Sequence, residues 1–193
     1  MKINLDRQLI IPYFFQSAKV SEVWAKKFKI QSASEDKTRI CLLFIDVQNT
    51  FCIPDFELFV AGKSGMGAVE DNIRLCEFIY RNLDVITEIT PTMDTHTAMQ
   101  IFHQIFWIDR TGGNPKPGTM ITLEDVQKKV WQVNPAIANN IDRGDYFALQ
   151  KHALHYVKKL TESGKYPLMV WSYHAMLGGI GHALFSAVEE AIF

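Results

Sequence analysis

Several polar side chains that can bind metals or transfer protons follow short apolar runs in this sequence. Asp46 ends the run 39–46, Asp94 and His96 follow the run 85–92, and His174 follows the run 167–171. One carboxylate and two imidazoles suit a divalent ion such as Zn, Fe(II) or Mn, and leave further coordination positions to water. An ion held in this open way can polarise a bound group as a Lewis acid.

The spacing of Asp94 and His96 supports a shared metal site. In an extended segment, residues two apart project to the same face, and His174 can join them from a neighbouring strand end. A D-x-H triplet also arises by chance, so the alternative is that these residues cap turns. His103 has apolar neighbours, which favour packing or support of a metal ligand over direct binding.

Asp46 is the other candidate for chemistry. It terminates the apolar segment RICLLFID, and a carboxylate in such surroundings is a candidate general base. The alternative is a turn or helix cap.

The elements that would position these residues alternate between strands and helices. The apolar runs 39–46, 85–92 and 167–171 predict strands, the first buried on both faces of a parallel sheet. Apolar residues at helical spacing predict helices; they are Val69, Ile73, Cys76, Tyr80 and Leu83, then Phe147, Leu154, Val157 and Leu160, then Ile180, Leu184, Val188 and Ile192. The second helix should close at Gly164. The segment 112–118, rich in Gly and Pro, predicts a loop.

This order predicts an α/β fold, a doubly wound (Rossmann-like) parallel sheet with helices on both faces. Ligands bind such sheets outside the carboxyl ends of the strands, where all the candidate residues would lie. We expect an N-terminal extension over residues 1–37 and the α/β domain over residues 38–193.

Composition narrows the functional classes. With 48% hydrophobic residues, the 193-residue chain can bury a sizeable core, and its net charge of −1 argues against nucleic acid or an anionic membrane as partner. The first forty residues contain neither a signal sequence nor an apolar run of membrane length, which favours the cytoplasm. Three irregularly spaced cysteines, Cys41, Cys52 and Cys76, predict reduced thiols.

Three motifs in order resemble the isochorismatase-like superfamily of cysteine hydrolases, nearest its nicotinamidase branch. They are LLFIDVQNTFC (42–52), TMDTHTAMQIFHQIFW (92–107) and WSYHAMLGGIGHAL (171–184). The sequence departs from the family pattern at Thr50, where a second acid is usual, at Ser172, where proline is usual, and at Ala175, where cysteine is common.

The resemblance implies hydrolysis of a C–N bond in a small, nicotinamide-like amide. Asp46 would be the acid of an Asp-Lys-Cys triad, and Asp94, His96 and His174 would bind the metal. Phe51 would stack on the substrate ring, with Trp107 as a candidate for the same pocket wall.

The lysine and the nucleophilic cysteine of the family follow the segment that contains His174, and residues 175–193 contain neither. We therefore expect the chain to be truncated before the nucleophile. One alternative is a noncatalytic metal-binding or interaction module, which would pair with a partner or form a homo-oligomer through an open sheet edge. Another is metal-dependent hydrolysis by a bound water, which needs no thiol.

Overall fold

A computed structural model describes residues 19–141, 144–164 and 166–192. Its chain contacts divide the protein into two compact units, Met1–Asp94 with Ala183–Phe193, and Thr95–His182. Residues 1–18 of the expected extension lie outside the described residues, and residues 19–28 form a helix. Within the described ranges, no helix has the length and apolar character needed to cross a bilayer.

The first unit contains a β-α-β arrangement, as the sequence predicts. Strand β1 (Cys41–Phe44) pairs in parallel with β2 (Glu88–Pro91), and helix α3 (Gly67–Arg81) lies between them in the chain. The register places Leu42 opposite Ile89. The protein is therefore a mixed α/β structure with a short parallel sheet.

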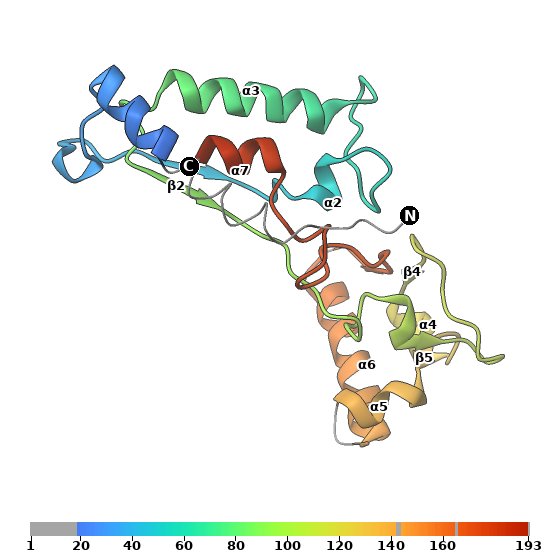
Figure 1. Cartoon of the computed structure of the whole chain (residues 1–193). Helices are drawn as coiled ribbons and strands as arrows, with labels where there is room; N and C mark the ends of the chain where they lie inside the picture. The colour runs from blue at the N-terminus through green and yellow to red at the C-terminus, as the bar shows by residue number, and fades with distance from the viewer. Residues whose placement is uncertain (1–18, 142–143, 165, 193) are drawn as a thin grey trace. The chain divides into compact units, whose positions relative to one another are not determined.

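Two helices lie on the same side of this strand pair, α3 and α7 (Ser186–Ile192) (Figure 1). Helix α3 buries Asn72 and Ile79. The predicted apolar face of α3 is partly wrong, because Ile73 and Tyr80 remain 57% and 42% exposed. These two side chains instead line a surface pocket of about 520 Å³ formed with α7. The helix over residues 19–28 and two further short helices, η1 (Ala33–Glu35) and α2 (Asn49–Cys52), also belong to this unit.

Strand β1 is not buried on both faces within the described residues. Leu43 and Ile45 are 56% and 68% exposed, whereas Phe44 is buried. Successive strand side chains alternate between faces, so the helices cover one face and leave the other open.

The third predicted strand exists but joins a different sheet. Strand β6 (Leu168–Met169) pairs antiparallel with β4 (Met120–Ile121) in the second unit. Among the described residues, β1 and β2 form a sheet of two strands. The segment 167–171 was apolar because it enters the core of the second unit, where Leu168 and Val170 are buried.

The second unit is richer in structure than the sequence predicted between residues 104 and 141. It contains η2 (Gln104–Phe106), β3 (Trp107–Ile108) paired antiparallel with β5 (Gln132–Val133), α4 (Leu123–Gln127) and α5 (Pro135–Ile141). Two-residue strands and five- to seven-residue helices are too short to show a clear periodicity.

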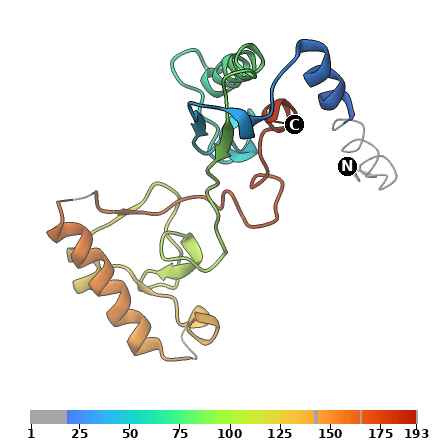
Figure 2. The same cartoon turned by 90° about the vertical axis from the view of Figure 1, so that its left-hand side faces the viewer.

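Helix α6 (Tyr146–Glu162) confirms the second predicted helix (Figure 2). It ends just before Gly164, whose φ of 66° is the left-handed conformation that favours glycine. Its buried stripe is Leu149, Ala153 and Val157. Of the apolar residues that predicted this helix, Val157 is buried, whereas Phe147 is 76% exposed.

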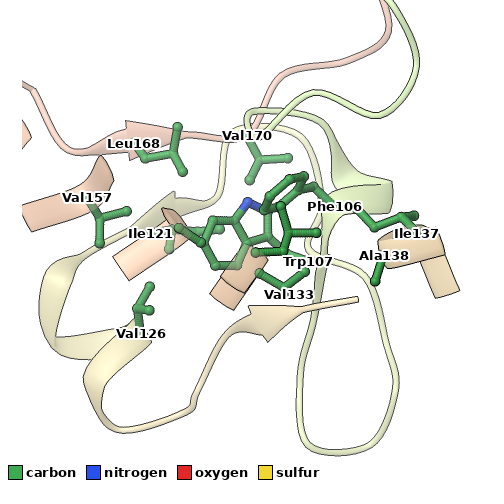
Figure 3. Packing of buried hydrophobic residues seen from close by; sticks show 12 residues of the cluster. Phe106, Trp107, Ile121, Val126, Val133, Ile137, Ala138, Val157, Leu168 and Val170 are labelled. Carbon is green, nitrogen blue, oxygen red and sulfur yellow. The ribbon is translucent and has the colours of Figure 1, made fainter. Parts of the chain in front are cut away.

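Trp107 lies in the hydrophobic core of the second unit (Figure 3). Its ring is fully buried among Ile121, Val133 and Val170, and its indole nitrogen donates a 2.6 Å hydrogen bond to the Ile101 carbonyl. Burial of an indole requires such a partner for the N–H. The position of Trp107 is that of a core residue.

The last predicted helix begins later than expected. Helix α7 starts at Ser186, whereas residues 177–183 form turns, and Ile180 is 71% exposed. Gly178 adopts φ 77°, which no right-handed helix contains. The apolar spacing of residues 180 and 184 was therefore not a helical stripe.

Candidate metal centre

Asp94, His96 and His174 lie together. One ligand atom from each lies within 4.8 Å of the other two. Asp94 is the last residue of the first unit and precedes His96 by only two positions, so the chain itself keeps these two residues close. His96 and His174 both belong to the second unit.

Backbone hydrogen bonds bring His96 and His174 together. The His96 N–H donates to the Ala175 carbonyl at 3.0 Å, and the Leu177 N–H donates to the His96 carbonyl at 2.9 Å. These bonds form an isolated parallel bridge, and the two imidazole centroids lie 4.7 Å apart. The convergence expected from strand ends is thus produced by two loop segments that pair over a short distance.

The His174 ring has a defined orientation. Only 6% of the residue is exposed, and Nδ1 lies 2.7 Å from the Ser172 carbonyl oxygen. A carbonyl can only accept, so this bond assigns the proton to Nδ1 and the lone pair to Nε2. Metal-binding histidines commonly have this arrangement, in which the second nitrogen is held by a backbone carbonyl.

His103 lies beside these rings and was not among the expected metal ligands. It is fully buried, and its ring centroid is 5.9 Å from His96 and 6.3 Å from His174. Nδ1 lies 3.1 Å from the Ala98 carbonyl, which leaves the lone pair on Nε2, and Nε2 has no hydrogen-bond partner among the described residues. A buried acceptor with no partner is costly, so this nitrogen is available to a bound ion or small molecule.

Burial lowers the pKa of His103 below its ordinary value, and the neighbouring His96 and His174 rings act in the same direction. His103 is therefore neutral near pH 7. The bridge between His103 and Trp171, with a 2.8 Å bond from the Trp171 N–H to the Phe102 carbonyl, fixes its segment. The apolar neighbours of His103 in the sequence favoured a packing role. The sequence therefore did not predict that the His103 ring lies beside those of His96 and His174.

Asp46 lies two residues after β1 and is tied to the end of β2. The Thr92 hydroxyl donates a 2.7 Å hydrogen bond to Asp46 Oδ1, and the Asp46 N–H donates to the same hydroxyl oxygen at 3.1 Å. Asp46 adopts φ 56°, a left-handed conformation that aspartate tolerates better than most residues. The carboxylate thus has a fixed position within the first unit.

Gln48 connects the same two chain segments. Its side chain is fully buried and bonds to the backbone of Asp94. Gln48 follows Asp46 by two residues in the sequence, but nothing in the sequence predicted that its side chain would bond to the backbone of Asp94.

The two residues expected to bind substrate, Phe51 and Trp107, belong to different units of the structure. Phe51 lies in α2, partly buried, and its N–H donates to the Gln48 carbonyl at 3.0 Å. Trp107 is in the core of the second unit, as described above. Phe51 thus belongs to the segment that contains Asp46 and Gln48.

The thiols of Cys52 and Cys76 ionise less readily than an ordinary cysteine thiol. Burial raises the pKa of the Cys52 thiol, and burial together with Glu190 raises that of Cys76. A nucleophilic cysteine requires the opposite shift, because the thiolate is the reactive form. Cys41 is exposed on β1.

The side chains present fit a divalent transition-metal ion. A carboxylate with two imidazoles is a common ligand set for zinc and for nonhaem iron, and the neutral His103 lies beside it. Comparison of the chain with protein-family models, with curated proteins and with solved structures gives no match.

Proposed function

We propose that the protein binds a divalent transition-metal ion through Asp94, His96 and His174 and carries the acid and metal-binding part of an amide-hydrolase site of the isochorismatase-like type. The lysine and the nucleophilic cysteine of that family have no counterpart in residues 175–193. The observation that carries the proposal is the approach of three ligand atoms to within 4.8 Å. The assignment to amide hydrolysis rests on the resemblance of the three motifs. The order of strands and helices in the sequence supports a doubly wound sheet, of which β1, α3 and β2 would form one unit, and the composition of the first forty residues supports a cytoplasmic location.

In this proposal the residues have separate roles. Asp94, His96 and His174 would hold the ion, which when bound supplies a Lewis acid that orients and polarises the substrate. Asp46, held by Thr92, would transfer protons to and from the reacting amide. Phe51, near Asp46 in the sequence, would contact an aromatic substrate.

Titration with cobalt(II) tests the metal site. The purified chain should bind Co(II) with a visible d–d absorption spectrum, and zinc should displace it. His174→Ala should weaken binding by more than about 100-fold, because loss of a direct ligand costs more than the 10–100-fold typical of an outer partner. His155→Ala is the matched control, since His155 is exposed on α6.

Equal affinity of the wild type and His174→Ala would contradict the proposed site. Binding lost equally in His155→Ala would also contradict it, since that result indicates nonspecific association with surface histidines.

Ammonia release from nicotinamide and related amides tests the chemistry. If a metal-bound water replaces the missing thiol, release should require the metal and should fall about 10²–10⁴-fold in Asp46→Asn, which keeps the side-chain shape but cannot transfer protons in the same way. Release that survives thiol alkylation but disappears on chelation would indicate a bound-water mechanism in place of the thiol. Absence of release from the metal-loaded chain would contradict hydrolysis of these amides by this chain.

The second candidate is a noncatalytic module on the same scaffold. It is favoured by the open face of β1, with Leu43 and Ile45 exposed, and by the raised pKa of the Cys52 and Cys76 thiols. A second copy of the chain would cover these apolar side chains. Sedimentation of the metal-loaded protein should then show a dimer that Ile45→Lys dissociates, and a monomer at high concentration would contradict this candidate.

A further inference from the structure

The side chain of Gln48 makes a pair of hydrogen bonds with the backbone of Asp94. Its Nε2 donates to the Asp94 carbonyl at 2.9 Å, and the Asp94 N–H donates to its Oε1 at 2.7 Å. Both residues belong to the first unit, and Gln48 is fully buried. The glutamine amide thus satisfies both backbone polar groups of one residue, as a neighbouring strand would.

The backbone of Gln48 is itself fixed. It forms an isolated antiparallel bridge with Leu184, and the flanking bonds run from the Asn49 N–H to the Ala183 carbonyl and from the Phe185 N–H to the Val47 carbonyl, each 2.9 Å. A side chain anchored in this way loses little further freedom when it binds Asp94. The amide is therefore held in place before any ligand arrives.

Asp94 needs such support because the sheet does not reach it. Strand β2 ends at Pro91, three residues earlier, and its last pairing is between Pro91 and Phe44. Beyond this point, ladder hydrogen bonds no longer set the φ and ψ of the chain. The direction of the Asp94 side chain depends on those angles, so whatever fixes the backbone also aims the carboxylate.

We propose that Gln48 is a positioning residue for the metal centre: it fixes the backbone of Asp94 so that the carboxylate is directed to the same point as the His96 and His174 imidazoles. This inference rests on the proposed metal site. Gln48 does not touch the ion and acts through Asp94. A primary amide suits the role because it presents a donor and an acceptor side by side, which a carboxylate or an apolar side chain does not.

The test compares three variants of the full chain by Co(II) titration. Gln48→Leu removes both hydrogen bonds at similar volume, and Gln48→Glu keeps the acceptor for the Asp94 N–H but loses the donor. Gln104→Leu is the control, because Gln104 Nε2 also donates to a backbone carbonyl, that of Pro115, at 2.9 Å and outside the Asp94 contact.

We expect Gln48→Leu to weaken Co(II) binding about 10–100-fold, the usual effect of losing an outer partner of a metal ligand. The d–d bands of the bound Co(II) should change in position and intensity, because the carboxylate no longer has a fixed direction. Gln48→Glu should show the same two changes. Gln104→Leu should retain the wild-type affinity and spectrum even if its melting temperature falls.

A Gln48→Leu protein with the wild-type affinity and d–d spectrum would overturn the inference and leave the metal site intact. If Gln48→Leu does not fold, Gln48→Glu decides by the same criteria. Failure of the folded wild type to bind Co(II) would instead refute the metal site, and with it the role of Gln48. Equal spectral changes in Gln104→Leu would also overturn the inference, since they would reflect general destabilisation.

Discussion

At the scale of single residues, two polar side chains tie the end of β1 to the segment after β2. Thr92 bonds to both the carboxylate and the N–H of Asp46, and Gln48 bonds to both backbone groups of Asp94. In each case one short side chain satisfies a donor and an acceptor where the strand ladder has ended. The two acidic residues of the candidate site thus depend on neighbours that do not themselves perform chemistry.

The Thr92 contact predicts a measurable contribution to stability. Thr92→Val keeps the shape of the side chain but leaves the partly buried Asp46 N–H and carboxylate without this partner. We expect the free energy of unfolding, measured with urea, to fall by about 1–3 kcal/mol. Asp46 should also become more mobile, which should lower any amide hydrolysis without changing the Co(II) affinity.

Thr90→Val provides the comparison, since Thr90 is in β2 but its hydroxyl takes part in exposed hydrogen bonds, donated to Glu88 and accepted from the Cys41 thiol. This variant should unfold within about 0.5 kcal/mol of the wild type, as surface changes usually do. Equal losses in the two variants would contradict a special role for Thr92.

At the scale of elements, the long helices were predictable and the short pieces were not. Helix α3 and helix α6 contain several turns, so their apolar spacing repeats often enough to be recognised. Helix α4 has five residues, but its N-terminal signal was present in the sequence as Thr122 and Asp125. These residues form a capping box in which each side chain bonds the backbone N–H of the other.

The capping box predicts the effect of a single substitution. Thr122→Ala should lower the free energy of unfolding by about 1 kcal/mol, because the N–H of Asp125 loses its acceptor at the helix start. Thr122→Ser retains the hydroxyl and should restore most of the loss. Urea unfolding followed by tryptophan fluorescence measures both, and equal stability of the alanine and serine variants would show that the cap does not stabilise α4.

At the scale of the whole molecule, the chain forms two compact units, and each has its own buried residues. In the first, Ile79 of α3 and Val188 of α7 are fully buried. In the second, a cluster around Trp107 gathers side chains from strands β3, β4, β5 and β6 and from helices α4, α5 and α6. The second unit, which contains His96, His103 and His174, therefore has its own hydrophobic core. The apolar pattern of the sequence did not predict this core.

The core of the second unit should respond strongly to truncation. Ile121 is fully buried, so Ile121→Ala should cost about 2–5 kcal/mol and Ile121→Val about 0.5–1.5 kcal/mol. Trp107 and Val133 pair in the β3–β5 ladder. Hydrogen exchange at their backbone amides should accelerate more in the variant that loses more free energy of unfolding. Unchanged exchange at these amides in Ile121→Ala would contradict the proposed extent of the core.

The sequence by itself determined the β-α-β unit and the identity of the candidate metal ligands. Strand β1 and helices α3 and α6 are defined by local apolar patterns, and Asp94, His96 and His174 are distinguished by residue type and spacing. These features depend on neighbours within a few positions along the chain, which a sequence displays directly.

Only the tertiary structure decided how those residues meet and what surrounds them. The pairing of His96 with Met176, the bonds from Gln48 to Asp94, and the place of His103 against the other two rings join segments up to 80 residues apart. The tertiary structure also pairs β6 with β4 and places Trp107 in the hydrophobic core of the second unit. Such contacts depend on which of several compatible partners packs best, and local patterns do not encode that choice.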